Sequence, residues 1–255
     1  MVTLFRSSLL LISAAALACP VLQAQTVDEI IAKNINARGG LENLRSIQTI
    51  RQTGKFSQQG FQAAFSQENK RPREVREELT IQGLSDVTAY DGKTGWHISP
   101  FSGRKDAELL SADDTKGLAE DSDIEGQLVD YKQKGSQAEL MGHDSVEGTD
   151  CYKIKLTLNN GDLRIYYLDA DSYLELKIET QRMIRGAFQY RDTLYGDYEQ
   201  VGGIYFPFAM DTGEKGDPNR VQLTVEKIEV NVPLDDKLFA VPGSNGSAKM
   251  PNSAK

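Results

Sequence analysis

The stretch that decides the fold is residues 152–167, which read YKIKLTLNNGDLRIYY. Apolar and polar side chains alternate on both sides of Asn160-Gly161, and a period of two is typical of strands with one buried face. An Asn-Gly pair between two such runs is the strongest short-range hairpin signal. The stretch therefore predicts two antiparallel strands, with Ile154 and Leu156 on the apolar side of the first.

The same alternation recurs on both sides of this hairpin. The further runs are residues 49–58, 61–69, 73–82, 86–91, 94–101, 174–179, 187–201, 204–210 and 220–232. In the last run the apolar phase slips between Val225 and Ile228, which predicts a β-bulge. Together the runs predict a mainly β chain with helices (α+β), built on about eleven antiparallel strands in one strongly curved sheet.

Two segments depart from the strand pattern and are predicted to be helical. Thr26 and Glu29 have capping-box spacing, apolar residues follow at helical period, and Gly39-Gly40 ends the pattern. Residues 105–134 form an acidic insert, in which Ser122 opens a second capping box and Gly135 stops a helix. A helical insert between two runs of strands must pack on the sheet, so we expect it to cover the sheet as a lid.

The acidity of the chain is confined to this region. The formal net charge is −8, but residues 106–150 alone hold 13 acidic and 3 basic side chains. Residues 44–76 hold seven basic and two acidic side chains, which either clamp the insert or form a solvated surface; for most of these charges we favour the solvated surface. An acidic chain is a poor partner for nucleic acid, where neutralising phosphates dominates the affinity.

The first 24 residues are predicted to be a cleaved secretory signal peptide. A short apolar run follows Arg6, and Leu22-Gln23-Ala24 can serve as the cleavage site. The mature chain would then begin at Gln25 and be exported. The alternative is a lipoprotein signal that acylates Cys19, which we favour less because Pro20 follows that cysteine directly.

The mature chain is predicted to be one domain, residues 25–241. Residues 242–255 consist largely of Pro, Gly, Ser, Asn and Lys, a composition that predicts a disordered tail. If Cys19 leaves with the signal peptide, Cys151 is the only remaining cysteine and no intrachain disulfide can form.

No motif predicts catalysis, a cofactor or a metal site. The sequence lacks a Gly-x-Ser-x-Gly elbow, a His-Glu-x-x-His pair and a phosphate-binding glycine loop, and it contains only two histidines. His143-Asp144-Ser145 has the residue types of a triad, but neighbours on an extended chain point in opposite directions. His97 is interpreted as a structural side chain, so we predict no enzyme, no cofactor and no metal.

The predicted sheet carries many large apolar side chains on period-two faces. They either fill a core or leave a groove under the helical insert, and the groove would suit acyl chains. The candidate groove residues are Phe61, Phe65, Leu79, Ile81, Trp96, Ile98, Ile154, Leu156, Leu174, Leu176, Ile178, Phe206, Phe208 and Met210. The candidate lid residues are Leu109, Leu110, Leu118, Ile124, Leu128 and Val129.

The order of several short motifs resembles one known family. The motifs are Gly39-Gly40-Leu41, Tyr90-Asp91-Gly92-Lys93-Thr94-Gly95-Trp96, Ile124-Glu125-Gly126, Glu147-Gly148-Thr149-Asp150-Cys151-Tyr152-Lys153-Ile154, Tyr167-Leu168-Asp169, Gly203-Ile204-Tyr205-Phe206-Pro207 and Pro233-Leu234-Asp235-Asp236-Lys237-Leu238-Phe239. Over residues 26–241 the chain resembles the LolA-like outer-membrane lipoprotein-sorting proteins, which include LolB-like and LppX-like lipid carriers.

The resemblance implies an incomplete antiparallel barrel with helices over its mouth. It also implies periplasmic carriage of lipoprotein acyl chains or lipids, with an envelope membrane protein as a further partner. The basic residue that governs lid closure in such carriers matches no position here. The alternative function is a sensor or interaction module on the same fold that binds no lipid, and an enzyme is third.

Overall fold

The computed structural model describes residues 25–243, in which one sheet carries three α-helices. The predicted signal peptide, Cys19 and most of the predicted tail lie outside the described residues. The helices are α1 (Val27–Ala37), α2 (Leu41–Ser46) and α3 (Ala112–Asp121), with 3-10 turns η1 (Pro100–Ser102) and η2 (Asp236–Leu238). None of these helices is long and apolar enough to cross a bilayer.

All strands belong to one antiparallel sheet. They are β1 (Thr49–Gln58), β2 (Phe61–Lys70), β3 (Glu74–Ile81), β4 (Leu84–Tyr90), β5 (Gly95–Ser99), β6 (Arg104–Leu109), β7 (Gln137–Val146), β8 (Thr149–Thr157), β9 (Leu163–Asp169), β10 (Glu175–Ile184), β11 (Ala187–Val201), β12 (Ile204–Glu214) and β13 (Val221–Val230). Their order is β6-β5-β4-β3-β2-β1-β13-β12-β11-β10-β9-β8-β7. The edge strands β6 and β7 do not pair with each other, so the sheet stays open.

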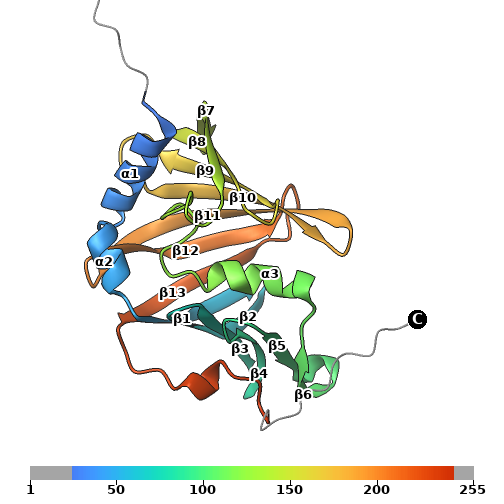
Figure 1. Cartoon of the computed structure of the whole chain (residues 1–255). Helices are drawn as coiled ribbons and strands as arrows, with labels where there is room; N and C mark the ends of the chain where they lie inside the picture. Colours follow the sequence, from blue (N-terminus) through green and yellow to red (C-terminus); the bar gives the residue numbers. More distant parts are fainter. Residues whose placement is uncertain (1–24, 244–255) are drawn as a thin grey trace, which may run out of the picture.

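The sheet curves around α3. In Figure 1 strands β1–β6 lie on one side of this helix and strands β10–β12 on the other. Helices α1 and α2 lie along one margin of the sheet, at the left of the view. Helix α3 contacts β3, β4, β5 and also β10, which lies far from them in the strand order. We call the face on which α1 and α3 pack the inner face, and the opposite one the outer face.

The sheet has 13 strands, so the prediction of about eleven is wrong by two. The missed strands are the edge strands β6 and β7, where exposed polar side chains obscure the alternation. The predicted bulge is confirmed, because Thr53 pairs with Lys227 and Gly54 with Val225, leaving Glu226 as the extra residue.

The amino-terminal helix is formed as predicted. The Thr26 hydroxyl accepts a hydrogen bond from the amide of Glu29, and the Glu29 carboxylate accepts one from the amide of Thr26. Ile30 and Ile31 are buried against Ile154 and Leu156 of β8. Capping therefore defines the start of α1, and its apolar face closes one end of the inner surface.

The acidic insert is not the helical lid that we predicted. Its first part is β6, only Ala112–Asp121 is α-helical, and residues 122–135 form turns. Ser122 does not open a second helix, because it is the C-cap of α3 and its hydroxyl donates to the carbonyl of Ala119. Gly126 (φ +82°) and Asp130 (φ +52°) then hold left-handed conformations that a helix cannot contain.

Candidate functional site

The inner face of the sheet and α3 border a hollow that is open to solvent, which we call the chamber. Its wider part has a volume of about 550 Å³ and lies between α3, β3 and the strands β9–β12. Its narrower part, about 160 Å³, lies against the turn segment 126–128. Arg164, Ile178 and Tyr195 line both parts, so the two parts adjoin at these side chains. The volume of the wider part is in the range usual for small-molecule sites.

The narrow part of the chamber is lined by five aromatic side chains and by three charged ones. It is lined by Arg38, Gly126, Gln127, Leu128, Arg164, Tyr166, Glu175, Ile178, Tyr195, Tyr198, Tyr205, Phe206 and Pro207. The phenol of Tyr198 donates to the carbonyl of Glu175 at 2.8 Å. Burial raises the pKa of Tyr195 and of Tyr198, so both phenols stay neutral. This end can therefore contact an apolar ligand without exposing a charge from either phenol.

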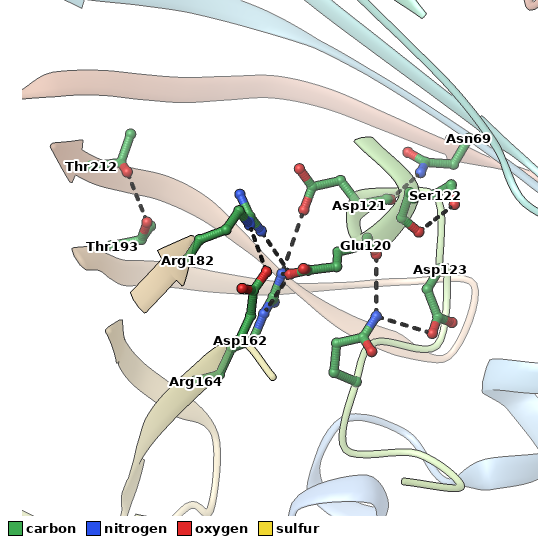
Figure 2. A network of polar contacts seen from close by, with 12 residues as sticks. Asn69, Glu120, Asp121, Ser122, Asp123, Asp162, Arg164, Arg182, Thr193 and Thr212 are labelled. Atoms are coloured by element: carbon green, nitrogen blue, oxygen red, sulfur yellow. Dashed lines mark hydrogen bonds and ion pairs between the residues drawn. The ribbon is translucent and has the colours of Figure 1, made fainter. Parts of the chain in front are cut away.

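The wide part is polar and carries a buried ion network, shown in Figure 2. Glu120 of α3 accepts hydrogen bonds on Oε2 from Arg164 of β9 at 2.5 Å and from Arg182 of β10 at 2.7 Å. Arg182 lies 3.4 Å from a carboxylate oxygen of Asp162, the last residue of the β8–β9 turn. The side chain of Glu120 is only 8% exposed, so these contacts are shielded from solvent.

The network explains how α3 is held to the sheet. Leu118 is its only buried apolar side chain, and one buried leucine gives the helix little apolar anchorage. Arg185 of the β10–β11 turn bonds Asp114 at 2.5 Å, and Lys116 donates to the carbonyl of Met183 at 2.9 Å. Asn69 of β2 donates to the carbonyl of Asp121 at 2.7 Å. Helix α3 is therefore fixed mainly by charged and polar contacts.

Glu77 of β3 also lines the wide part of the chamber. Burial, with a smaller repulsion from Asp121, raises the pKa of its carboxyl to about 7. Most of the chamber wall around it is polar, so the expectation of an apolar groove under the insert is wrong for this part.

An apolar strip continues the inner face across β12, β13, β1, β2 and β3. Phe206, Phe208, Met210, Leu223, Phe56 and Leu79 pack against a buried core but each remains partly exposed. Strand pairing places Met210 beside Leu223 and Leu223 beside Phe56. Because each of these side chains is partly exposed, the strip offers apolar surface to a ligand.

Several predicted groove residues lie on the inner face as expected. Phe65 is buried in the core beneath the strip, Ile178 lines both parts of the chamber, and Phe61 and Ile81 lie at strand ends. Ile154 and Leu156 also face inward, but both are fully buried beneath α1. These two side chains therefore belong to the filled core and do not face open space.

Trp96, Ile98 and Leu176 were predicted on the groove side, and that prediction is wrong. Pairing places Trp96 opposite Ala89, in the phase of the outer face, where its indole donates to the carbonyl of Phe239 at 2.7 Å. Ile98 packs in the same outer cluster. A register shift between Glu175 and Lys177 turns Leu176 to the outer face, because an extra residue inverts the alternation.

Leu174 precedes β10 and lies in the turn between β9 and β10, so it does not line the chamber either.

The predicted lid residues do not form one apolar face. Leu109 lies in β6 and packs in the outer cluster with Trp96. Leu110 approaches Gly95 at the start of α3, and Leu118 is the buried residue of that helix. The leucines of strand β6 and helix α3 therefore pack on different faces of the sheet.

The turn segment 122–135 fills the inner face between two parts of the core. Val129 is fully buried beside Leu44 of α2, with Ile124 packed against the same cluster, whereas Leu128 packs beside Ile30 of α1. The segment is held by Arg45, Arg71 and Arg73, which pair with Asp130, Glu125 and Asp123. Three residues of the basic stretch therefore hold the insert, although Arg45 and Arg73 also remain about half exposed to solvent.

Both described histidines contact charged side chains. His143 Nδ1 lies 2.9 Å from Asp150, and His97 Nε2 lies 3.5 Å from Glu108. Neither of these contacts joins a histidine to a serine or cysteine nucleophile. In residues 25–243 no group of three His, Cys, Asp or Glu side chains is arranged to hold a metal.

The sequence analysis missed the ion network. Arg164 alternates with the apolar Leu163 and Ile165 along β9, a pattern that predicts a solvent-facing side chain, but Arg164 pairs with Leu156 and therefore faces inward. The five-residue turn 158–162 brings Thr157 opposite Leu163 and sets this register. Counting outward from that pair would have placed Tyr166 and Arg164 beside Ile154 and Leu156.

Comparisons with known proteins address the fold. A family model described as "Uncharacterized protein" matches residues 117–242. No curated protein matches the chain. The solved structures that resemble it include a domain from Vibrio parahaemolyticus named for outer membrane lipoprotein sorting, with 12% identity and a TM-score of 0.57 over 83% of this chain and 95% of that one.

A LolA superfamily protein from Nitrosomonas europaea is also similar, with 12% identity and a TM-score of 0.53 over 78% of this chain and 95% of that one. The chain has the LolA-like fold. A DUF1329 family protein from Desulfovibrio piger is similar to this chain as well, with 12% identity and a TM-score of 0.52 over 84% of this chain and 97% of that one. At such identities the likeness concerns architecture, and function must be argued from the site.

Proposed function

We propose that the chain is a periplasmic carrier or binder of lipid-type cargo, of the outer-membrane lipoprotein-sorting kind, exported through a cleaved signal peptide and without catalytic activity. The cargo is the acyl chain of a lipoprotein or lipid. The observation that carries the proposal is the partly exposed apolar strip on the inner face of an open sheet, next to a chamber with an aromatic end.

The strip supports acyl binding by simple energetics. Removing each methylene group from water contributes about 0.8 kcal/mol, so a long chain gains enough free energy to offset its ordering cost. The aromatic pocket, at about 160 Å³, is small compared with usual ligand sites, so it suits the end of a chain better than a whole lipid. The remainder would lie along Phe206, Phe208 and Met210.

The polar part of the chamber suits the other end of an amphiphile. Its wall offers arginines, carboxylates, hydroxyls and an amide within the same volume as Ile178 and Tyr195. A lipid needs both environments, because its head group must remain hydrated or hydrogen-bonded while its chain is withdrawn from water.

The test is uptake of a dansyl-labelled fatty acid by the chain from Gln25 onward, followed by fluorescence. A Phe208→Ser/Met210→Ser double variant is expected to bind about tenfold more weakly, since two apolar contacts are lost. Met141→Ser is the matched control, because Met141 is an exposed apolar residue on edge strand β7, away from the strip. Equal affinity of all three proteins, or no uptake by the unmodified chain, would contradict the proposal.

A further inference from the structure

A second hollow borders α3, apart from the chamber. It has a volume of about 540 Å³ and lies between α3, the turn segment 122–135 and the β8–β9 turn. It shares no lining residue with the wide part of the chamber and only Gln127 with the narrow part. Its volume is in the range usual for small-molecule sites. We call this hollow the side pocket.

Buried polar side chains line the side pocket. Glu120, Gln127 and Ser136 all border it, and they are only 9%, 7% and 7% exposed. The amide of Gln127 makes long contacts, to a carboxylate oxygen of Asp123 at 3.3 Å and to the carbonyl of Glu120 at 3.4 Å. The Glu120 carboxylate accepts from both arginines on Oε2, whereas its Oε1 has no hydrogen-bond partner within residues 25–243. A buried polar atom without a partner is costly, so this wall has unused capacity for hydrogen bonds.

The cations around the side pocket are already paired. Lys134 lies 2.6 Å and Arg73 lies 3.8 Å from Asp123, and Lys116 lies 2.9 Å from Asp113. An anionic ligand would have to compete with these carboxylates for the same cations. We therefore expect the ligand of the side pocket to be uncharged.

The rest of the wall consists largely of uncharged polar groups. Side-chain amides and one hydroxyl line it, and they are Gln127, Gln133, Ser136, Asn159 and Asn160. An amide both donates and accepts hydrogen bonds, as does each hydroxyl of a sugar. Ala119, Leu158 and the ring of Tyr90 supply apolar contacts, which suit the C–H faces of a sugar ring.

We propose that the side pocket binds a neutral sugar, either free or as the head group of a lipid. Adjacent hydroxyls of a sugar can bond amides and a carboxylate oxygen at the same time. The termini of a short peptide would instead add charges, and the charged groups of this wall already have partners. The inference goes beyond the proposed acyl cargo and is tested without it.

The first test is an NMR titration of the chain from Gln25 onward with glucose, maltose and N-acetylglucosamine, followed through the side-chain amide signals. At least one of these sugars is expected to shift the signals of Gln127, Gln133 and Asn159, with a dissociation constant in the millimolar range. Diglycine is the comparison ligand and should leave these signals unchanged. No shift with any of the three sugars, or the same shifts with diglycine, would overturn the proposal.

Two double variants locate the site. Gln133→Ala/Asn159→Ala removes two exposed amides of the pocket wall and should weaken sugar binding about tenfold, because two hydrogen bonds are lost. Gln62→Ala/Gln200→Ala removes two exposed amides of β2 and β11 that do not line the pocket, and it should bind as the unmodified chain does. The amide spectrum reports whether each variant is folded. Equal sugar affinities of the two folded variants would overturn the proposal.

Octyl glucoside, below its micelle concentration, separates the two sources of the sugar. If the ligand is a lipid head group, octyl glucoside should bind about tenfold or more tightly than glucose, because the side pocket adjoins the narrow part of the chamber at Gln127. Equal affinities for the two would identify a free sugar as the ligand. Gln133→Ala/Asn159→Ala should still take up the labelled fatty acid, so failure of the sugar titration leaves the acyl-cargo proposal standing.

Discussion

Glu77 illustrates how a single side chain depends on its enclosure. The sequence pattern predicts that a glutamate on a half-polar strand is solvated. The curvature of the sheet instead places Glu77 in the chamber wall, facing α3. Burial and the nearby Asp121 raise the pKa of its carboxyl from 4.5 to about 7. Between these two pH values the folded chain binds more protons than the unfolded chain, so this group makes stability fall as pH rises.

Replacing Glu77 should remove that pH dependence. Glu77→Gln is expected to raise the free energy of unfolding at pH 8 by on the order of 2 kcal/mol, with little change near pH 4. Urea unfolding at the two pH values measures the difference. Glu199→Gln, at an exposed position of β11, is the control and should change neither. A gain of the same size at both pH values would show that the ionisation of Glu77 is not its cause.

At the scale of elements, α3 is held to the sheet mainly by ion pairs, whereas most helices are held by apolar packing. Glu120 joins it to β9 and β10 through Arg164 and Arg182. Breaking a buried ion pair on one side leaves the other charges desolvated and uncompensated, which costs far more than losing an exposed pair.

Glu120→Gln should therefore destabilise the chain by about 3 kcal/mol and loosen α3 selectively. Glu108→Gln, which removes a half-exposed partner of Arg104, should cost less than about 1 kcal/mol. Urea unfolding gives the energies, and hydrogen exchange of residues 112–121 locates the loosening. Unchanged protection of α3 in the Glu120 variant would refute this account of its attachment.

The pairing of β1 with β13 depends on the absence of a side chain at Gly54. A Cβ at this position would collide with the carbonyl oxygen of Thr224, beside the bulge at Glu226. We expect Gly54→Ala to lower the free energy of unfolding by about 2 kcal/mol, since backbone must move to admit the methyl group. Gly196→Ala on β11 is the matched control, because its Cβ would meet only Ala209 at 4.0 Å. Equal unfolding energies for the two variants would contradict the clash.

At the scale of the whole molecule, the two faces of the sheet are covered by different parts of the chain. The helices and the turn segment 122–135 cover the inner face, and the C-terminal segment covers part of the outer face through Phe239, which is fully buried. The only tryptophan, Trp96, lies under that segment and so reports on the outer face.

Phe239→Ala should cost about 3–5 kcal/mol through the cavity it leaves and should shift Trp96 emission to the red. Uptake of the labelled fatty acid should be unchanged, because this packing is on the opposite side of the sheet from the chamber and the strip. Fluorescence emission and the uptake assay, run on the same sample, measure both effects. Loss of uptake with the fold intact would place the cargo site elsewhere.

The sequence by itself determined the local elements. The Thr26 capping box, the strand runs around Asn160-Gly161 and the bulge after Val225 are all present, because each depends on side chains within a few residues of one another. It also predicted the architecture, since a long series of alternating strands has few ways to bury one face.

Tertiary structure alone decided which residues meet across the chamber. One extra residue before Lys177 turned Leu176 outward, and the turn at 158–162 placed Arg164 inward, where Glu120 meets it from α3. Period-two patterns fix which side chains share a face within a strand, but they do not fix register between strands or the contacts of a distant helix. Those depend on pairing and curvature, which only the assembled sheet provides.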